Sequence, residues 1–97
     1  MGKVYVGDVG TIIRANIGVD VTGMLWGRLY VKKPNGSDPV VWECTVDPED
    51  STKIRYVTQP GDVDDFGMYL IMSRVKKDGW GPLWGDTFEW IVHAKWK

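Results

Sequence analysis

Short apolar segments alternate with clusters of Gly, Pro, Asn and Asp along this chain of 97 residues. Within the segments, apolar and polar residues tend to alternate at every second position, as in a strand whose two faces meet different surroundings. No stretch of useful length repeats its apolar residues with the period of a helix. The pattern predicts seven strands, at residues 3–6, 11–17, 25–32, 39–46, 53–58, 67–76 and 86–96.

Polar and glycine-rich segments separate the predicted strands. The clearest is Lys33-Pro34-Asn35-Gly36-Ser37, in which Pro sets the first corner while Asn and Gly tolerate a positive φ. This turn predicts an antiparallel hairpin between residues 25–32 and 39–46. The acidic residues 47–52 predict a solvated loop, and residues 78–85, rich in Gly and Trp, predict a long loop between the last two strands.

The segment Asp65-Phe66-Gly67-Met68-Tyr69 looks like the tyrosine corner of immunoglobulin-like sandwiches. In that corner, the Tyr hydroxyl bonds back to the backbone of the preceding turn. Together with seven short strands, it predicts an all-β fold, an immunoglobulin-like antiparallel β-sandwich, with residues 1–97 as one domain. The first, second and fifth strands would form one sheet, and the other four strands the second sheet.

An inward Tyr69 leaves the alternate residues of strand 67–76 on the outer face of the sheet, which is the face opposite Tyr69. Polar residues are expected on such a face, yet six large apolar residues fall there: Trp26, Tyr30, Met68, Leu70, Met72 and Ile91. An exposed apolar patch usually marks an interface, with another protein or with a second copy of the chain. The alternative is that the N-terminal strand or residues 77–85 fold over the patch.

Two more aromatic residues, Trp80 and Trp84, lie in the predicted loop at residues 78–85. Exposed Trp side chains can anchor a protein contact or stack on a sugar ring, and they can also fold back onto the sandwich. The absence of nearby Asn, Gln and His favours a protein partner. The alternative function is a carbohydrate-binding module that uses Trp80 and Trp84. The predicted binding residues are Trp26, Tyr30, Leu70, Met72, Trp80 and Trp84.

The charge and composition of the chain restrict the classes of partner that it can bind. The net charge is −1 and the basic residues are dispersed, which gives no electrostatic footprint for a nucleic acid. No apolar run approaches the roughly 18 residues of a membrane span, and residues 1–8 lack the apolar region of a signal peptide. The single Cys44 cannot form an internal disulfide, which fits a reducing compartment. We therefore expect synthesis in the cytoplasm and no nucleic-acid or membrane partner.

Few residues offer catalytic or metal-binding chemistry. Cys44 falls on a core face of its strand, and nothing in the sequence brings His93 to it. Asp62, Asp64 and Asp65 could hold a calcium ion, but their spacing does not match an EF-hand, and capping of a turn also explains them. We predict no enzymatic activity, no catalytic residue, no metal site and no cofactor.

Several motifs occur in a recognisable order along most of the chain. They are VGDVGT at residues 6–11, GVDVTG at 18–23, VKKPNG at 31–36, Trp42, and GDVDDFGMY at 61–69. This order resembles small structural proteins of phages and prophages with an immunoglobulin-like domain, such as the N-terminal domain of phage baseplate upper proteins and related tail proteins. The resemblance implies a non-enzymatic tail or baseplate component located in the virion. The many Trp residues and the aromatic segment at 78–85 depart from that family's pattern.

Overall fold

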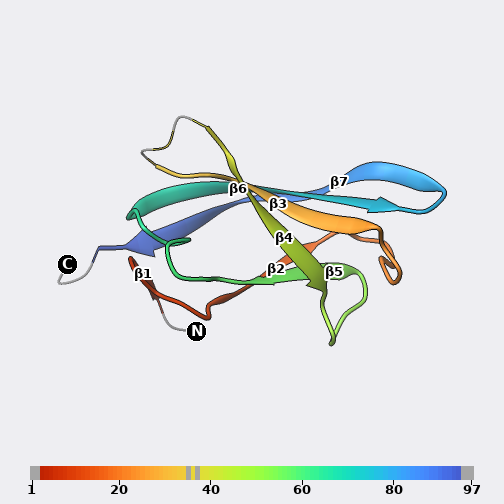
Figure 1. Cartoon of the computed structure of the whole chain (residues 1–97), viewed down its shortest axis with the longest axis horizontal. Helices are drawn as coiled ribbons and strands as arrows, with labels where there is room; N and C mark the ends of the chain where they lie inside the picture. Colours follow the sequence, from red (N-terminus) through yellow and green to blue (C-terminus); the bar gives the residue numbers. More distant parts are fainter. Residues whose placement is uncertain (1–2, 35, 37, 95–97) are drawn as a thin grey trace.

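The computed structural model describes residues 3–34, 36 and 38–94, and all regular structure in them is β-strand. The all-β prediction is therefore confirmed, and the predicted ranges of the first six strands agree with the structure to within one residue at each end. The strands of this part of the chain (Figure 1) are β1 (Val4–Tyr5), β2 (Ile12–Asn16), β3 (Trp26–Lys32), β4 (Val40–Val46), β5 (Lys53–Val57), β6 (Gly67–Lys77) and β7 (Trp80–His93).

The strands form one curled mixed sheet, a half-barrel, in the order β1-β7-β6-β3-β4-β5-β2. Strand β4 belongs to both parts of the sheet, because residues 40–44 pair with β3 while Thr45 and Val46 pair with β5. The predicted division into two facing sheets is therefore not confirmed. Strand β1 pairs in parallel with β7, at Val4 and Val92. The prediction that all strands pair antiparallel is therefore wrong.

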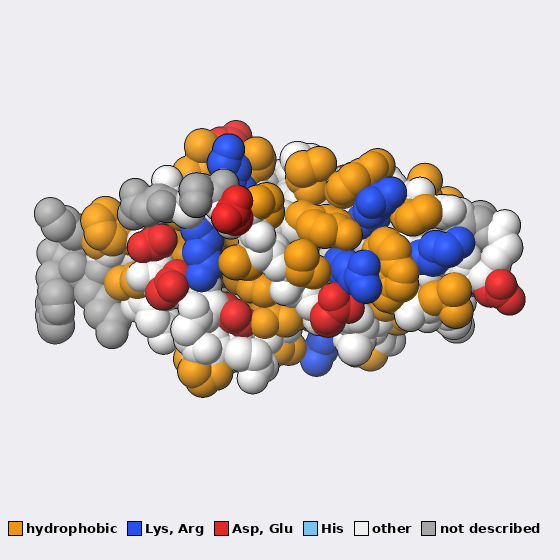
Figure 2. All heavy atoms as spheres, turned by 45° about the horizontal axis from the view of Figure 1, so that its top comes forward, with side chains coloured by type: hydrophobic (Ala, Val, Ile, Leu, Met, Phe, Trp, Pro, Cys, Tyr) orange, Lys and Arg blue, Asp and Glu red, His pale blue; other side chains and the backbone are white. Residues whose placement is uncertain are grey.

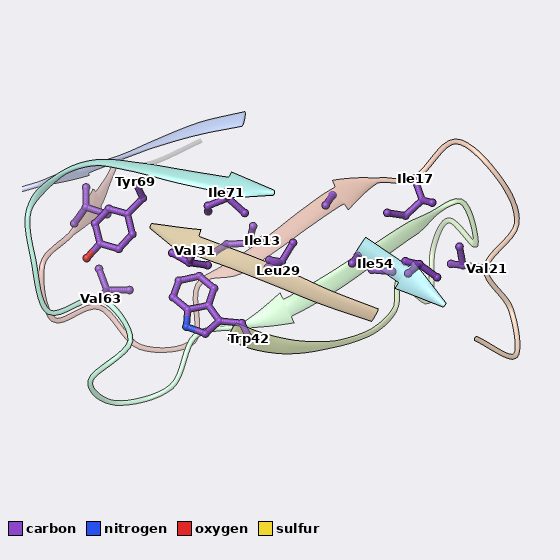
Figure 3. Packing of buried hydrophobic residues seen from close by; sticks show 13 residues of the cluster. Ile13, Ile17, Val21, Leu29, Val31, Trp42, Ile54, Val63, Tyr69 and Ile71 are labelled. Carbon is purple, nitrogen blue, oxygen red and sulfur yellow. The ribbon is translucent and has the colours of Figure 1, made fainter. Parts of the chain in front are cut away.

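The core fills the concave side of the sheet (Figure 3). Trp42 of β4 stacks on Tyr56 of β5, with 4.8 Å between ring centroids, and meets Trp90 of β7 edge-on. Full burial of an aliphatic side chain contributes about 1.5–3 kcal/mol, so this cluster is the main source of stability. Its buried members are Ile13, Ala15, Ile17, Val21, Leu29, Val31, Trp42, Ile54, Val63, Tyr69, Ile71, Val75 and Val92.

Tyr69 forms the predicted corner at the start of β6. Its hydroxyl donates to the backbone oxygen of Asp65 at 2.7 Å and accepts from the Asp65 N–H at 3.1 Å. The ring is fully buried and meets Trp90 edge-on, at a centroid distance of 5.5 Å. Tyr69 therefore points inward as predicted, and its neighbours Met68 and Leu70 point to the opposite face.

Residues 80–85, predicted to lie in a long loop, are part of strand β7. Lys77 pairs with Trp80, so only Asp78 and Gly79 form the turn between β6 and β7. An Asp-Gly pair suits such a two-residue hairpin turn because Gly accepts a positive φ, which is 91° at Gly79. The two strands therefore form one long hairpin that extends well to the right in Figure 1.

A β-bulge in this hairpin brings β7 close to β2. Gly85 and Asp86 together oppose the single residue Ser73 of β6, whose hydroxyl donates to the Asp86 backbone oxygen at 2.9 Å. A Cβ atom at Gly85 would lie only 3.0 Å from the backbone oxygen of Asn16, at the end of β2. Because Gly85 has no side chain, the end of β2 can lie close to β7, as the curl of the sheet requires.

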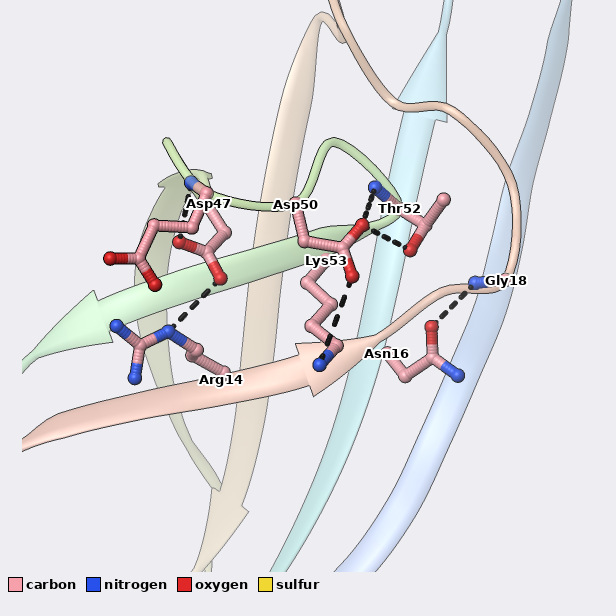
Figure 4. A network of polar contacts seen from close by, with 8 residues as sticks. Arg14, Asn16, Gly18, Asp47, Asp50, Thr52 and Lys53 are labelled. Carbon is pink, nitrogen blue, oxygen red and sulfur yellow. Dashed lines mark hydrogen bonds and ion pairs between the residues drawn. The ribbon is translucent and has the colours of Figure 1, made fainter.

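The loop at residues 47–52 is more ordered than the predicted solvated loop (Figure 4). Asp47 is only 3 % exposed, and its carboxylate accepts from Nε of Arg14 at 3.0 Å and from the N–H of Glu49 at 3.2 Å. A buried carboxylate needs such partners. Asp50 accepts from the hydroxyl and N–H of Thr52, and these hydrogen bonds lower the pKa of Asp50. Arg14 therefore ties the loop to β2.

Candidate functional site

The outer face of β3, β6 and β7 exposes large apolar side chains to solvent. Met68 is 51 %, Leu70 40 % and Met72 36 % exposed on β6, and Ile91 is 50 % exposed on β7. The strand register sets Met68 opposite Ile91, and Met72 opposite Tyr30 of β3. These side chains therefore form one patch across three neighbouring strands, as the alternation predicts.

Figure 2 turns the upper side of the molecule toward the viewer and shows apolar side chains running along it. Basic side chains lie among them in the right half, where Figure 1 places the β6–β7 hairpin. Single exposed apolar residues are normal on a protein surface, whereas a contiguous patch needs an explanation. The outer face is thus the strongest candidate site in the described part of the chain.

Neither segment that was predicted as a possible cover lies over the outer face. Strand β1 pairs with the edge of β7 through Val4 and Tyr5. Residues 80–85 extend β7 beside β6 instead of folding back. Leu70 and Met72 consequently remain more than one third exposed. Within the described residues, the patch is open to a partner.

The structure brings most of the predicted binding residues together. Leu70 and Met72 belong to the patch itself, and Tyr30 is half-buried beside Met72. Trp84 is 49 % exposed and contacts Tyr30, with ring centroids 5.7 Å apart. Trp26 is half-buried at the start of β3. The side chain of Trp80 lies outside the described part, so its role stays a prediction.

Two arginines, Arg28 and Arg74, also lie on the outer face, beside Trp26 and Trp84. The predicted set of binding residues did not include them. Arg28 and Arg74 stand directly opposite each other on β3 and β6. The Cζ atom of Arg28 lies 4.1 Å from the ring centroid of Trp26, and that of Arg74 lies 4.5 Å from that of Trp84. The alternation that placed Trp26 and Tyr30 on this face also placed Arg28 between them, so the signal was present in the sequence.

Cys44 and His93 do not form a catalytic pair. Cys44 pairs with Gly27 on β3, and Gly27 in turn pairs with Val75 near the hairpin end of β6. His93 is the last residue of β7, at the other end of the sheet, where its ring contacts that of Tyr5 with centroids 5.9 Å apart. The thiol of Cys44 instead points to the backbone oxygen of Trp42, at 3.4 Å.

Burial raises the pKa of the Cys44 thiol from 9.0 to about 12, and the neighbouring charge of Glu43 adds to the effect. Only the thiolate attacks disulfide reagents, so native Cys44 should react with Ellman's reagent at pH 8 about 1,000-fold more slowly than in urea. Between about pH 9 and 12 the native state keeps the proton of the Cys44 thiol, whereas the unfolded chain loses it. The free energy of unfolding should therefore fall as the pH rises from about 9 to 12. Native and unfolded rates within a few-fold of each other would contradict the burial.

Two of the three acidic residues before Tyr69, Asp62 and Asp64, form side-chain contacts with other protein groups. Asp62 accepts hydrogen bonds from the hydroxyl of Tyr56 and, at 2.7 Å, from the N–H of Gln59. Asp64 pairs with Lys33 at 2.6 Å, and this hydrogen bond lowers the pKa of Asp64. No group of three or more His, Cys, Asp or Glu side chains converges on a common point among the described residues. The contacts account for Asp62 and Asp64 as residues that order the turn.

Comparison of the chain with protein-family models, with curated proteins and with solved structures finds no match. Among the residues that the structure describes, no helix is long and apolar enough to cross a membrane.

Proposed function

We propose that this chain is a non-enzymatic structural module that docks onto another protein through its outer face. The observation that carries the proposal is the exposure of Met68, Leu70, Met72 and Ile91 on adjacent strands while Tyr69 holds the other face in the core. Removal of such a patch from water contributes about 25 cal/mol for each Å² of apolar surface buried, which favours association.

The order of turn motifs along the chain supports a place for this module in a phage or prophage virion, at the tail or baseplate. The tyrosine corner at Tyr69 further supports an immunoglobulin-like ancestry, with the curled sheet as a variant of the two-sheet sandwich. The proposed partner is then a larger assembly protein or a second copy of the chain.

A carbohydrate-binding module remains the second candidate, and one observation weakens it. A sugar ring needs a free aromatic face, and the guanidinium of Arg74 covers one face of the Trp84 ring. Tryptophan fluorescence that changes with a neutral sugar, and that loses this response in Trp84→Ala, would favour the sugar over the protein partner.

The proposal is tested with the proteins encoded beside this chain in its genome, each co-expressed with it and purified. We expect one of them to bind, and the double variant Leu70→Asp/Met72→Asp to weaken binding more than about 100-fold, since each Asp would bury an unpaired charge. Isothermal titration calorimetry measures the change, and light scattering of the chain alone measures self-association.

The matched control is Ile12→Asp, because Ile12 is 43 % exposed on β2, outside the outer face. This variant should bind as the unchanged chain does. The proposed docking surface would be contradicted if the double variant bound as tightly as the unchanged chain. It would also be contradicted if the control lost as much affinity as the double variant.

A further inference from the structure

Near its hairpin end, the outer face holds a cation, Arg74, for which the described residues provide no carboxylate partner. Arg28 and Arg74 stand opposite each other on neighbouring strands, where like charges destabilise the pair. Arg28 has partners, since its Nε donates to Glu43 at 3.0 Å and a side-chain hydrogen bond to Tyr30 raises its pKa, with Glu43 adding to the rise. No ion pair found among the described residues includes Arg74.

Arg74 is also incompletely hydrogen-bonded. Its Nε atom is buried from solvent and has no hydrogen-bond partner in the described structure. A buried donor without an acceptor costs free energy that a partner can return. The guanidinium rests on the ring of Trp84, and no carboxylate among the described residues forms an ion pair with it.

The surroundings of Arg74 match an acidic protein partner. Apolar side chains lie along β6 next to it, with Met72 two residues away and Tyr30 opposite Met72. A carboxylate of β7, Glu89, stands opposite Leu70, four residues along β6 from Arg74. A ligand that covers the face therefore has to bring its own anion to Arg74 and apolar groups to Met72.

A second copy of the chain meets this requirement only in particular orientations. Rotation about an axis along β6, for example, would set the two copies of Arg74, which lies on β6, against each other. Charge complementarity thus favours a different chain.

We propose that Arg74 and Trp84 form a carboxylate-binding subsite, which takes an Asp or Glu side chain that a partner protein presents among apolar residues. This inference rests on the proposed docking function and names the chemistry of its partner. Bidentate pairing of the guanidinium with a carboxylate would fix the register of the two proteins, while the apolar patch supplies contact area.

The test uses two short peptides, one in which Glu alternates with Leu and its counterpart with Gln in place of Glu, titrated into the folded protein and followed by NMR. The Glu peptide should shift the Arg74 Nε–Hε and Trp84 indole signals and bind about tenfold more tightly than the Gln peptide. Arg74→Met, which keeps an apolar stem on Trp84, should abolish the difference, and Arg74→Lys should restore only part of it.

Arg55→Met on β5 is the matched control and should leave the preference for Glu unchanged. Equal affinity for both peptides would overturn the carboxylate subsite while leaving the apolar docking surface in place. Binding of neither peptide would also overturn the subsite, and the double variant at Leu70 and Met72 tests docking separately. Glucuronate that shifts the same signals at lower concentration than the Glu peptide would assign the subsite to an acidic sugar and overturn the protein partner.

Discussion

Replacement of Trp42 by alanine is expected to be the most destabilising of the proposed substitutions, at about 3–5 kcal/mol. Trp42 is 4 % exposed and joins β4 to β5 and β7 through ring contacts with Tyr56 and Trp90. Truncation of a buried Trp costs about 3–5 kcal/mol, which approaches the whole stability of many small domains. Urea denaturation followed by far-ultraviolet circular dichroism measures the loss.

Trp84→Ala is the matched control, because Trp84 is 49 % exposed on the outer face. Its main contacts are with Arg74 and Tyr30, so we expect a loss below about 1 kcal/mol. If the two Trp variants were destabilised equally, the assignment of the inner and outer faces would be wrong.

Gly85→Ala is expected to be the next most damaging single change, with a loss of about 3 kcal/mol. The new Cβ atom would lie 2.7 Å from Oγ of Ser73 and 3.0 Å from the backbone oxygen of Asn16, and it would also overlap the side chain of Ile17. Backbone atoms cannot rotate away as a side chain can, so β2 and β7 would have to separate. Thermal unfolding measures the loss.

Gly36→Ala is the control for the glycine series. The nearest atom to a Cβ at Gly36 would lie at 3.5 Å, an ordinary contact, so its stability should change by less than about 0.5 kcal/mol. A Gly85 variant as stable as the Gly36 variant would show that β7 does not approach β2 as closely as described.

The strands and the corner could be predicted from the sequence because both are local signals. Alternation assigned the faces of β3 and β6, and the short segment from Asp65 to Tyr69 is enough to define the corner. The Asp78-Gly79 turn was also a readable signal for a two-residue hairpin. It was outweighed by the Gly, Pro and Trp residues that follow it, which are typical of a loop.

The curl of the sheet could not be predicted in the same way, because it depends on contacts between distant residues. The pairing of β1 with β7 joins Val4 to Val92. The close approach of β7 to β2 at Gly85 depends on where β2 ends. The buried Asp47 likewise forms its ion pair with a residue distant in the sequence, Arg14 on β2. Local composition carries none of this information, so Asp47 was predicted to be solvated.

The methionine methyl groups allow the most direct measurement of the central claim that the outer face is an open docking surface. In a chain labelled at these methyls, a soluble paramagnetic agent should strongly broaden the NMR signals of Met68 and Met72. It should affect Met24 less, because Met24 packs partly buried against the core. A bound partner should protect Met68 and Met72. Signals of Met68 and Met72 that are as protected as that of Met24 before any partner is added would contradict the account.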